Sequence, residues 1–204
     1  MQPLQVKEGI IIRKGEKTKQ FVIEKTALLL NQRGFLSTSL AEITDATGLQ
    51  KGGLYNHFKD KEELMLESFK HCCALVNEQM EPVMASQPTS LGQLTAFIDF
   101  YCGLDFPGGC PIVNATVEAH AVSPPLYEQA GQAMDNLLAF IGEIIQSGIS
   151  SGEIRAQVIP KDAALFILSA VEGGLVMHKL YPGNSSITTV REQLFRYIES
   201  ELKK

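Results

Sequence analysis

Residues 34–64 read GFLSTSLAEITDATGLQKGGLYNHFKDKEEL and predict two short helices joined by a tight turn and followed by a third helix. Ser39 followed by Glu42 is a capping-box pattern, so the first of these helices should begin immediately after Ser39. Gly48 stands where the chain must leave that helix with a positive φ, and the second helix then begins near Gln50. The stretch therefore predicts a helix-turn-helix unit.

The second helix is expected to present a polar, open face. Leu54 and Phe58 are four residues apart and should both point inward, which turns the remaining side chains outward. Glycine inside a helix costs about 1 kcal/mol relative to alanine, so the two glycines here need another reason. In our interpretation, that reason is close approach of the backbone to a phosphate. The outward positions are Gln50, Lys51, Gly52, Gly53 and Tyr55.

The third helix carries an expected anion site at its start. Asp60 and Glu63 repeat the capping-box pattern, and Lys61 lies in the first turn. Unpaired backbone amides at a helix start point outward and attract anions. A lysine beside them indicates a phosphate-binding position.

The order of these parts resembles the amino-terminal domain of TetR-type transcriptional regulators. The residues that carry the resemblance are Gly34, Phe35, Thr38, Ser39, Leu40, Ile43, Gly48, Leu49, Lys51, Gly52, Leu54, Tyr55, His57, Phe58, Lys61 and Glu62. It implies an all-α protein, in which a three-helix helix-turn-helix DNA-binding domain precedes a larger helical ligand-binding and dimerisation domain. With 204 residues available, we expect these domains to span residues 1–62 and 63–204.

The expected DNA contacts separate into two kinds. Gln50 replaces the serine usual in the family and offers an amide that can read adenine, while Gly53 removes a side chain from the base-facing surface. We expect Gln50 and Asn56 to touch base edges, and Lys51, Tyr55, His57 and Lys61 to hold phosphates. The full expected DNA-binding set is Thr38, Ser39, Gln50, Lys51, Gly52, Tyr55, Asn56, His57 and Lys61.

Charge is distributed unevenly along the chain, whose net charge is −5. Residues 1–70 contain 11 Lys and Arg against 9 Asp and Glu, whereas residues 71–204 contain 7 against 14. A basic head on an acidic body fits a DNA-binding protein. Four basic residues near the amino terminus are placed to reach phosphates, although a solvated terminus is the open alternative. They are Arg13, Lys14, Lys17 and Lys19.

The remaining chain predicts a helical body without a secretory signal. Four cysteines in that context favour reduced thiols and a cytoplasmic protein. The apolar stretch 163–180 contains Glu172 and is short for a membrane span, so no membrane partner is expected. It is apolar nearly all round, which predicts burial on every side. The resemblance implies that this helix and the last one pair with their symmetry mates in a homodimer, which would suit a pseudo-palindromic operator.

The resemblance also implies a cavity for a small-molecule inducer in the body. We expect it to be lined by Phe97, Tyr101, Asn114, Glu118 and Met134, which combine aromatic, polar and flexible apolar groups. The alternatives are ordinary core packing for the apolar three, and a solvated face or structural hydrogen bond for Asn114 and Glu118. The long helix from Lys61 is the only continuous element expected to join this cavity to the head.

Cys110 is the most notable of the four thiols. A thiolate at a helix start would be stabilised by free amides, which suggests a redox or electrophile sensor within the ligand site. Its alternative role is that of a small apolar residue at a turn. The run His71, Cys72 and Cys73 has no second ligand pair at zinc spacing, so neither metal nor cofactor is expected.

These patterns favour a ligand-responsive DNA-binding regulator, most simply a repressor released by a small molecule or electrophile. The sequence contains no phosphate-binding loop, no zinc-protease helix and no nucleophile elbow, so an enzyme is not expected. The alternative is a helical scaffold or signalling protein with a vestigial DNA-binding head. A vestigial head would have little reason to keep all four expected phosphate contacts, which are Lys51, Tyr55, His57 and Lys61.

Overall fold

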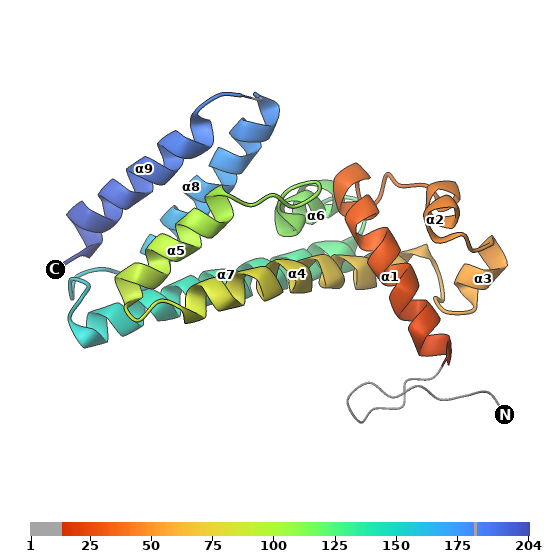
Figure 1. Ribbon diagram of the computed structural model, residues 1–204, viewed down its shortest axis with the longest axis horizontal. Helices are drawn as coiled ribbons and strands as arrows, with labels where there is room; N and C mark the ends of the chain where they lie inside the picture. The colour runs from red at the N-terminus through yellow and green to blue at the C-terminus, as the bar shows by residue number, and fades with distance from the viewer. Residues whose placement is uncertain (1–13, 182) are drawn as a thin grey trace.

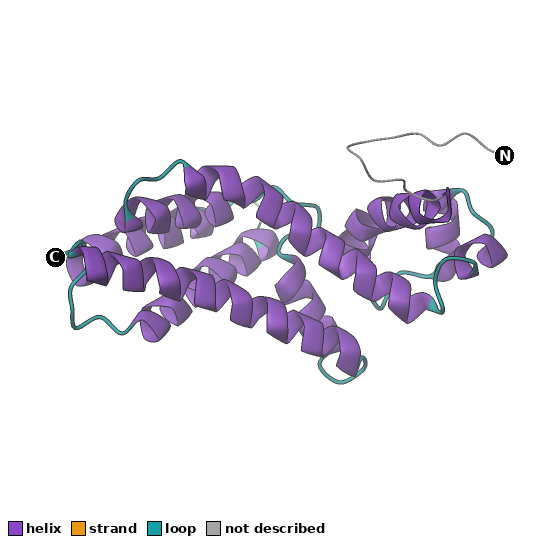
Figure 2. Cartoon of the chain, turned by 90° about the horizontal axis from the view of Figure 1, so that it is seen from below, coloured by secondary structure: helices purple, strands orange, loops and turns teal. Residues whose placement is uncertain are grey.

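The computed structural model describes residues 14–181 and 183–204, and every regular element in that part of the chain is a helix. The all-α prediction is therefore confirmed (Figure 2). The helices are α1 (Lys14–Arg33), α2 (Leu40–Thr47), α3 (Lys51–Tyr55), α4 (Lys61–Ala85), α5 (Ser90–Cys102), α6 (Pro111–Ala119), α7 (Pro124–Ser151), α8 (Pro160–Leu180), α9 (Ser186–Tyr197) and the short π-helix η1 (Ile198–Leu202).

Helices α1, α2 and α3 form a head at one end of the molecule (Figure 1). Leu54 and Phe58 are buried there, as their four-residue spacing predicted. Phe35 packs edge-on against Phe69 of α4, with ring centroids 5.8 Å apart. The first turns of α4 thus complete the core of the head.

Helix α4 joins the head to the body and runs beside α7 (Figure 1). Asp60 caps it, because the Asp60 carboxylate accepts a 2.8 Å hydrogen bond from the Glu63 amide. The predicted box is completed differently from expectation, since the Glu63 carboxylate accepts from the amide of Lys59 rather than from that of Asp60. The proposed boundary after residue 62 falls in the first turn of this helix and stays a prediction.

The body consists of α5 to α9, of which α5, α6 and α7 pack against α4. Its fully buried side chains are mainly aliphatic and include Leu94, Ile98, Leu126, Ile141, Ile145 and Ile154. Helix α8 is long and apolar enough to cross a membrane by length and composition, and 39% of its most apolar window is buried. One apolar face of α8 is exposed in the single chain, so burial on every side stays a prediction that depends on the expected pairing with a symmetry mate.

Candidate DNA-binding surface and ligand cavity

The turn between α2 and α3 has the geometry that its sequence predicted. The amide of Ser39 donates to the Glu42 carboxylate at 2.8 Å, and the Ser39 hydroxyl accepts from the Glu42 amide at 3.3 Å. The Ser39 hydroxyl also donates to the Glu42 carboxylate at 2.8 Å. The hydrogen bonds from the Ser39 amide and hydroxyl, together with Arg33, lower the pKa of Glu42 to about 2. Gly48 then ends α2 in the left-handed region, with φ of +68°. The capping box and the turn are confirmed.

Helix α3 presents a polar surface at the tip of the head (Figure 1). The positions on it that are exposed are Gln50, Lys51, Gly52, Tyr55 and Asn56. A Cβ atom added to Gly52 would meet no atom within 4 Å, and one added to Gly53 would make only ordinary contact with Leu49. Packing within the described chain therefore requires neither glycine, which leaves an external requirement such as close approach of DNA.

Thr38 is a correction to the expected DNA-binding set. Its side chain is buried, and its hydroxyl donates to the carbonyl of Gly34 at 2.7 Å. The hydroxyl therefore stabilises the chain between α1 and α2 and is buried in the free protein. Ser39 is exposed beside it at the start of α2.

Two of the basic side chains around the head already have partners within the protein. Lys61 donates to the carbonyl of Leu36 at 3.2 Å, which leaves further ammonium donors for an anion. Lys19 forms an ion pair with Glu63 at 2.7 Å and lies over the ring of Phe58, so it braces the head. Arg13, expected to reach phosphates, lies outside the described residues.

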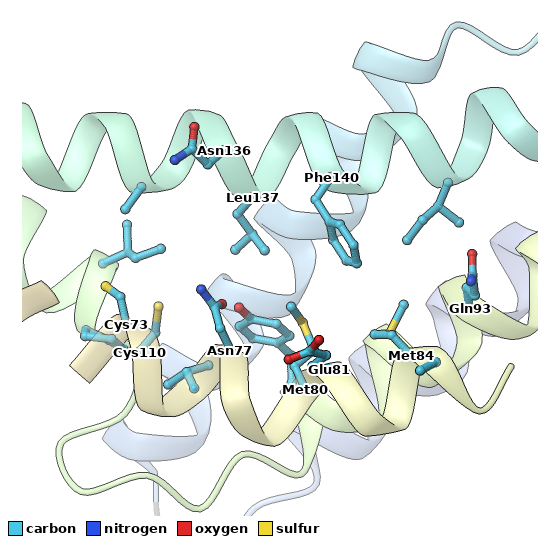
Figure 3. A pocket seen from close by; sticks show the side chains of 17 residues that line it. Cys73, Asn77, Met80, Glu81, Met84, Gln93, Cys110, Asn136, Leu137 and Phe140 are labelled. Carbon is cyan, nitrogen blue, oxygen red and sulfur yellow. The ribbon is translucent and has the colours of Figure 1, made fainter. Parts of the chain in front are cut away.

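A cavity of about 590 Å³ lies in the body between α4, α5, α7 and the start of α6. Figure 3 shows Asn77, Met80 and Glu81 on α4 facing Asn136, Leu137 and Phe140 on α7. The lining residues are Cys73, Val76, Asn77, Met80, Glu81, Met84, Ala85, Gln93, Tyr101, Cys110, Pro111, Ile112, Ala133, Asn136, Leu137, Phe140 and Ile144.

The structure brings only two of the six expected ligand residues to this cavity, namely Tyr101 and Cys110. Phe97 is fully buried and packs on Tyr101, with ring centroids 4.6 Å apart, so it belongs to the core behind the wall. Met134 is half-buried and packs against the core. Asn114 and Glu118 contact the head instead, and their expected ligand role is corrected accordingly.

Cys110 is also not the activated thiol that its helix-start position predicted. Burial raises its pKa well above the usual range, and the nearby Glu172 carboxylate raises it further. The amides of Ile112 and Val113 oppose this shift more weakly. Burial likewise raises the pKa of Cys73 to about 12. Desolvation therefore outweighs the helix start, and Cys110 is a thiol in this structure.

The loop before α6 ties the body to the end of α1. Asn31 donates through its side-chain amide to the carbonyls of Pro107 and Gly109, at 2.7 and 2.9 Å. Asn114 donates to the carbonyl of Gly108 at 2.9 Å and to the Asn31 side chain at 3.2 Å. Gly108 has φ of +88°, and a Cβ there would lie 2.2 Å from the Asn31 carbonyl oxygen. Only glycine permits this close approach.

A second contact joins α6 to the head one turn further along. The Glu118 carboxylate accepts from the backbone amide of Leu36 at 3.0 Å. Beyond the end of α6, the Ser123 hydroxyl donates to the Glu62 carboxylate at 3.2 Å. These hydrogen bonds correct the expectation that α4 alone connects cavity and head. Because α6 begins in the cavity wall, it provides a shorter connection.

Comparison with known proteins agrees with this architecture. Residues 22–67 match the family described as bacterial regulatory proteins, tetR family, and residues 91–194 match the tetracyclin repressor-like, C-terminal domain. A TetR-family regulator from Cytophaga hutchinsonii superposes with a TM-score of 0.90 at 30% identity, over 96% of this chain and 100% of that one.

Two further relatives extend the comparison. A TetR regulator from Chloroflexus aurantiacus gives a TM-score of 0.89 at 31% identity, over 94% of this chain and 99% of that one. The transcriptional repressor DhaR of Mycobacterium sp. strain GP1 is 25% identical over 89% of this chain and 94% of its own length. With both of its parts matched, this chain belongs to the TetR family of DNA-binding transcriptional regulators.

Proposed function

We propose that this regulator is a homodimeric repressor, which a small molecule bound between α4 and α7 releases from a pseudo-palindromic operator. The observation that carries the proposal is the position of the cavity, whose wall includes the first turn of α6. The same helix holds the head through Asn114 and Glu118. The repressor character is drawn from the name of DhaR. Four free cysteines support a cytoplasmic location.

DNA is read by α3 in this proposal. Gln50 and Asn56 contact base edges from the exposed face, while Lys51, Tyr55, His57 and Lys61 hold phosphates. Gly52 supports this arrangement because its open surroundings allow the backbone to approach a phosphate closely. A protein that used only its helical body as a scaffold would have no need for this surface.

Dimerisation occurs through α8 and α9. Leu165 and Phe166 are 52% and 50% exposed, and Val176 and Met177 continue the same face two to three turns further along. Gly173 lies between them, and a Cβ there would meet no atom within 4 Å, so another helix can approach closely. Exposed apolar surface of this extent is typical of a protein interface.

The dimer is tested by light scattering coupled to size-exclusion chromatography. Leu165→Glu should give a monomer at micromolar concentration, because it introduces a charge into the apolar face. Val122→Glu is the matched control, since Val122 is 72% exposed at the α6–α7 turn, away from α8. A wild-type monomer, or loss of the dimer in both variants, contradicts the proposed interface.

Release requires that the inducer bind more tightly to the conformation that misfits the operator, because equal affinity for both conformations shifts nothing. An inducer in the cavity displaces the start of α6 near Cys110 and Ile112. Helix α6 passes that displacement to the head through Asn114 and Glu118. The separation of the two recognition helices in the dimer then changes.

DNA binding is tested by fluorescence anisotropy with a duplex from beside the coding region of the protein. We expect saturable binding whose affinity falls as the salt concentration rises. The Lys51→Ala variant should bind the same duplex more weakly than the wild type. Lys70→Ala removes the same charge from an exposed position on α4 and should bind as the wild type does. Equal, weak affinity for this duplex and for scrambled DNA would favour a scaffold protein with a vestigial head.

A further inference from the structure

Among the described residues, the wall of the cavity contains no positively charged side chain. None of its 17 lining residues is Lys, Arg or His, and the only one with a formal charge is Glu81. A carboxylate or phosphate removed from water needs a cationic or clustered amide partner. The polar groups available instead are neutral, namely the side chains of Asn77, Gln93, Tyr101 and Asn136. An anionic ligand would therefore be poorly compensated here.

Glu81 is available to a ligand. No ion pair engages it among residues 14–181 and 183–204. Figure 3 shows its carboxylate beside α4, across the cavity from Phe140 on α7, and the Glu81 side chain is exposed at this edge of the cavity. Aromatic faces attract cations, and the ring of Tyr101 lines the same space. One carboxylate and two aromatic rings form a suitable environment for a positively charged nitrogen.

A second carboxyl group lies in the wall behind Cys110. Glu172 is 8% exposed, contacts the Cys110 thiol, and leaves its Oε1 atom without a hydrogen-bond partner. When the Glu172 carboxyl group is ionised, it repels an anion at that end of the cavity. When it is protonated, it carries no charge. In neither form does Glu172 provide the positive charge that an anionic ligand would need.

The rest of the wall fits a long apolar body. Lining positions on α4 extend from Cys73 to Ala85, a length of about 18 Å at 1.5 Å per residue. Met80 and Met84 lie along this length, and their flexible thioethers adapt to ligands of different shape. Leu137 continues the apolar lining on α7. The cavity is thus elongated and mainly apolar, with Glu81 about two-thirds of the way from Cys73 to Ala85.

We infer that the cavity takes an elongated, mainly apolar organic cation, whose nitrogen lies beside Glu81. This inference rests on the proposed function only in treating the cation as the inducer, because binding itself can be measured without DNA. The apolar body of the ligand lies between α4 and α7. The amides of Asn77 and Gln93 accommodate neutral polar substituents.

The test is isothermal titration calorimetry of the full chain with two probes that share one alkyl chain. Decyltrimethylammonium and decanoate are both used below their micellar concentrations. We expect the cation to bind with saturation and decanoate to bind at least tenfold more weakly. Glu81→Gln should weaken cation binding about fivefold, as for a partly screened ion pair. Glu78→Gln is the control, since Glu78 is exposed on α4 outside the cavity wall.

Three outcomes overturn the inference: decanoate binds as tightly as the cation, neither probe binds, or Glu81→Gln and Glu78→Gln behave alike. Failure of the proposed function is recognised separately, by adding the cation to the protein–operator complex. If the cation binds through Glu81 and the complex persists, the ligand class stands and the proposed release of DNA does not.

Discussion

The head and the cavity are built differently. The head is braced internally by short polar contacts, such as the ion pairs of Arg33 with Glu42 and of Lys19 with Glu63. The cavity is lined by flexible thioethers and unpaired side chains, including Met80 and Glu81. On this basis we expect the head to move as a rigid unit and the cavity to adapt to its occupant. In the proposed mechanism, an inducer then changes where the head lies rather than how it is folded.

The largest expected effect breaks the junction between these two regions. Gly108→Ala should lower the free energy of unfolding by about 2–4 kcal/mol, because strain at positive φ adds to a clash with the Asn31 carbonyl. Gly109→Ala is the matched control, with φ of +83° and nothing within 4 Å of its Cβ, and should cost about 1–2 kcal/mol. Urea denaturation measures both. Equal losses would show that the close approach at Gly108 does not matter.

The next effect concerns the head alone. Gln50→Ala should reduce the binding free energy that discriminates between bases at one operator position by about 1–3 kcal/mol. Discrimination at other positions should not change, because Gln50 is exposed and its side-chain amide makes no capping hydrogen bond. Lys61→Ala should weaken binding to all duplexes alike and lower the salt dependence. Competition binding with single-base operator variants separates the two. If both variants retain wild-type affinity, α3 is not the reading helix.

A smaller effect is expected where α6 meets the head. Glu118→Ala removes the acceptor for the Leu36 amide and should destabilise the protein by about 1 kcal/mol. It should leave affinity for a cavity ligand unchanged while reducing the shift in operator affinity that the ligand causes. Paired titrations of ligand and of DNA measure this coupling. If the ligand shifts operator affinity equally in the wild type and in Glu118→Ala, the ligand acts on the head through α4 alone.

The smallest effect concerns Cys110. Because burial raises the pKa of its thiol, the thiolate fraction should rise about tenfold per pH unit across pH 7 to 9, without a plateau. Alkylation by iodoacetamide, followed by mass spectrometry, should show the same rise and be slow at pH 7. Cys110→Ser should leave operator release by electrophiles unchanged. Fast alkylation of Cys110 at pH 7, with loss of release in this variant, would restore the sensor hypothesis.

Local sequence determines the head, so the head could be predicted. Ser39, Glu42 and Gly48 act on neighbours within a few residues, and their caps and turn are confirmed. The cavity depends on which faces of α4 and α7 meet, which no local pattern specifies. Met80, for example, lines the cavity, although nothing in its sequence neighbourhood marks it as a ligand residue.

Polar residues of the body show the same limit. Asn114 and Glu118 were correctly identified as unusual, and the alternative of structural hydrogen bonds is confirmed for both. Their partners lie more than 80 residues away along the chain, at Asn31 and Leu36. Sequence shows that such residues need partners but not where the partners are. The apolar character of α8 illustrates a related point, because a face that a second subunit buries resembles core in sequence.

Selection of bound sequences from random duplex DNA by the full-length chain tests the central claim most directly. A dimer that reads DNA through two copies of α3 should enrich an inverted repeat, with half-site centres about 34 Å or a multiple of this apart. Gln50→Ala should relax the choice at one symmetry-related pair of positions. Enrichment of a site without twofold symmetry, or no enrichment at all, would contradict the account.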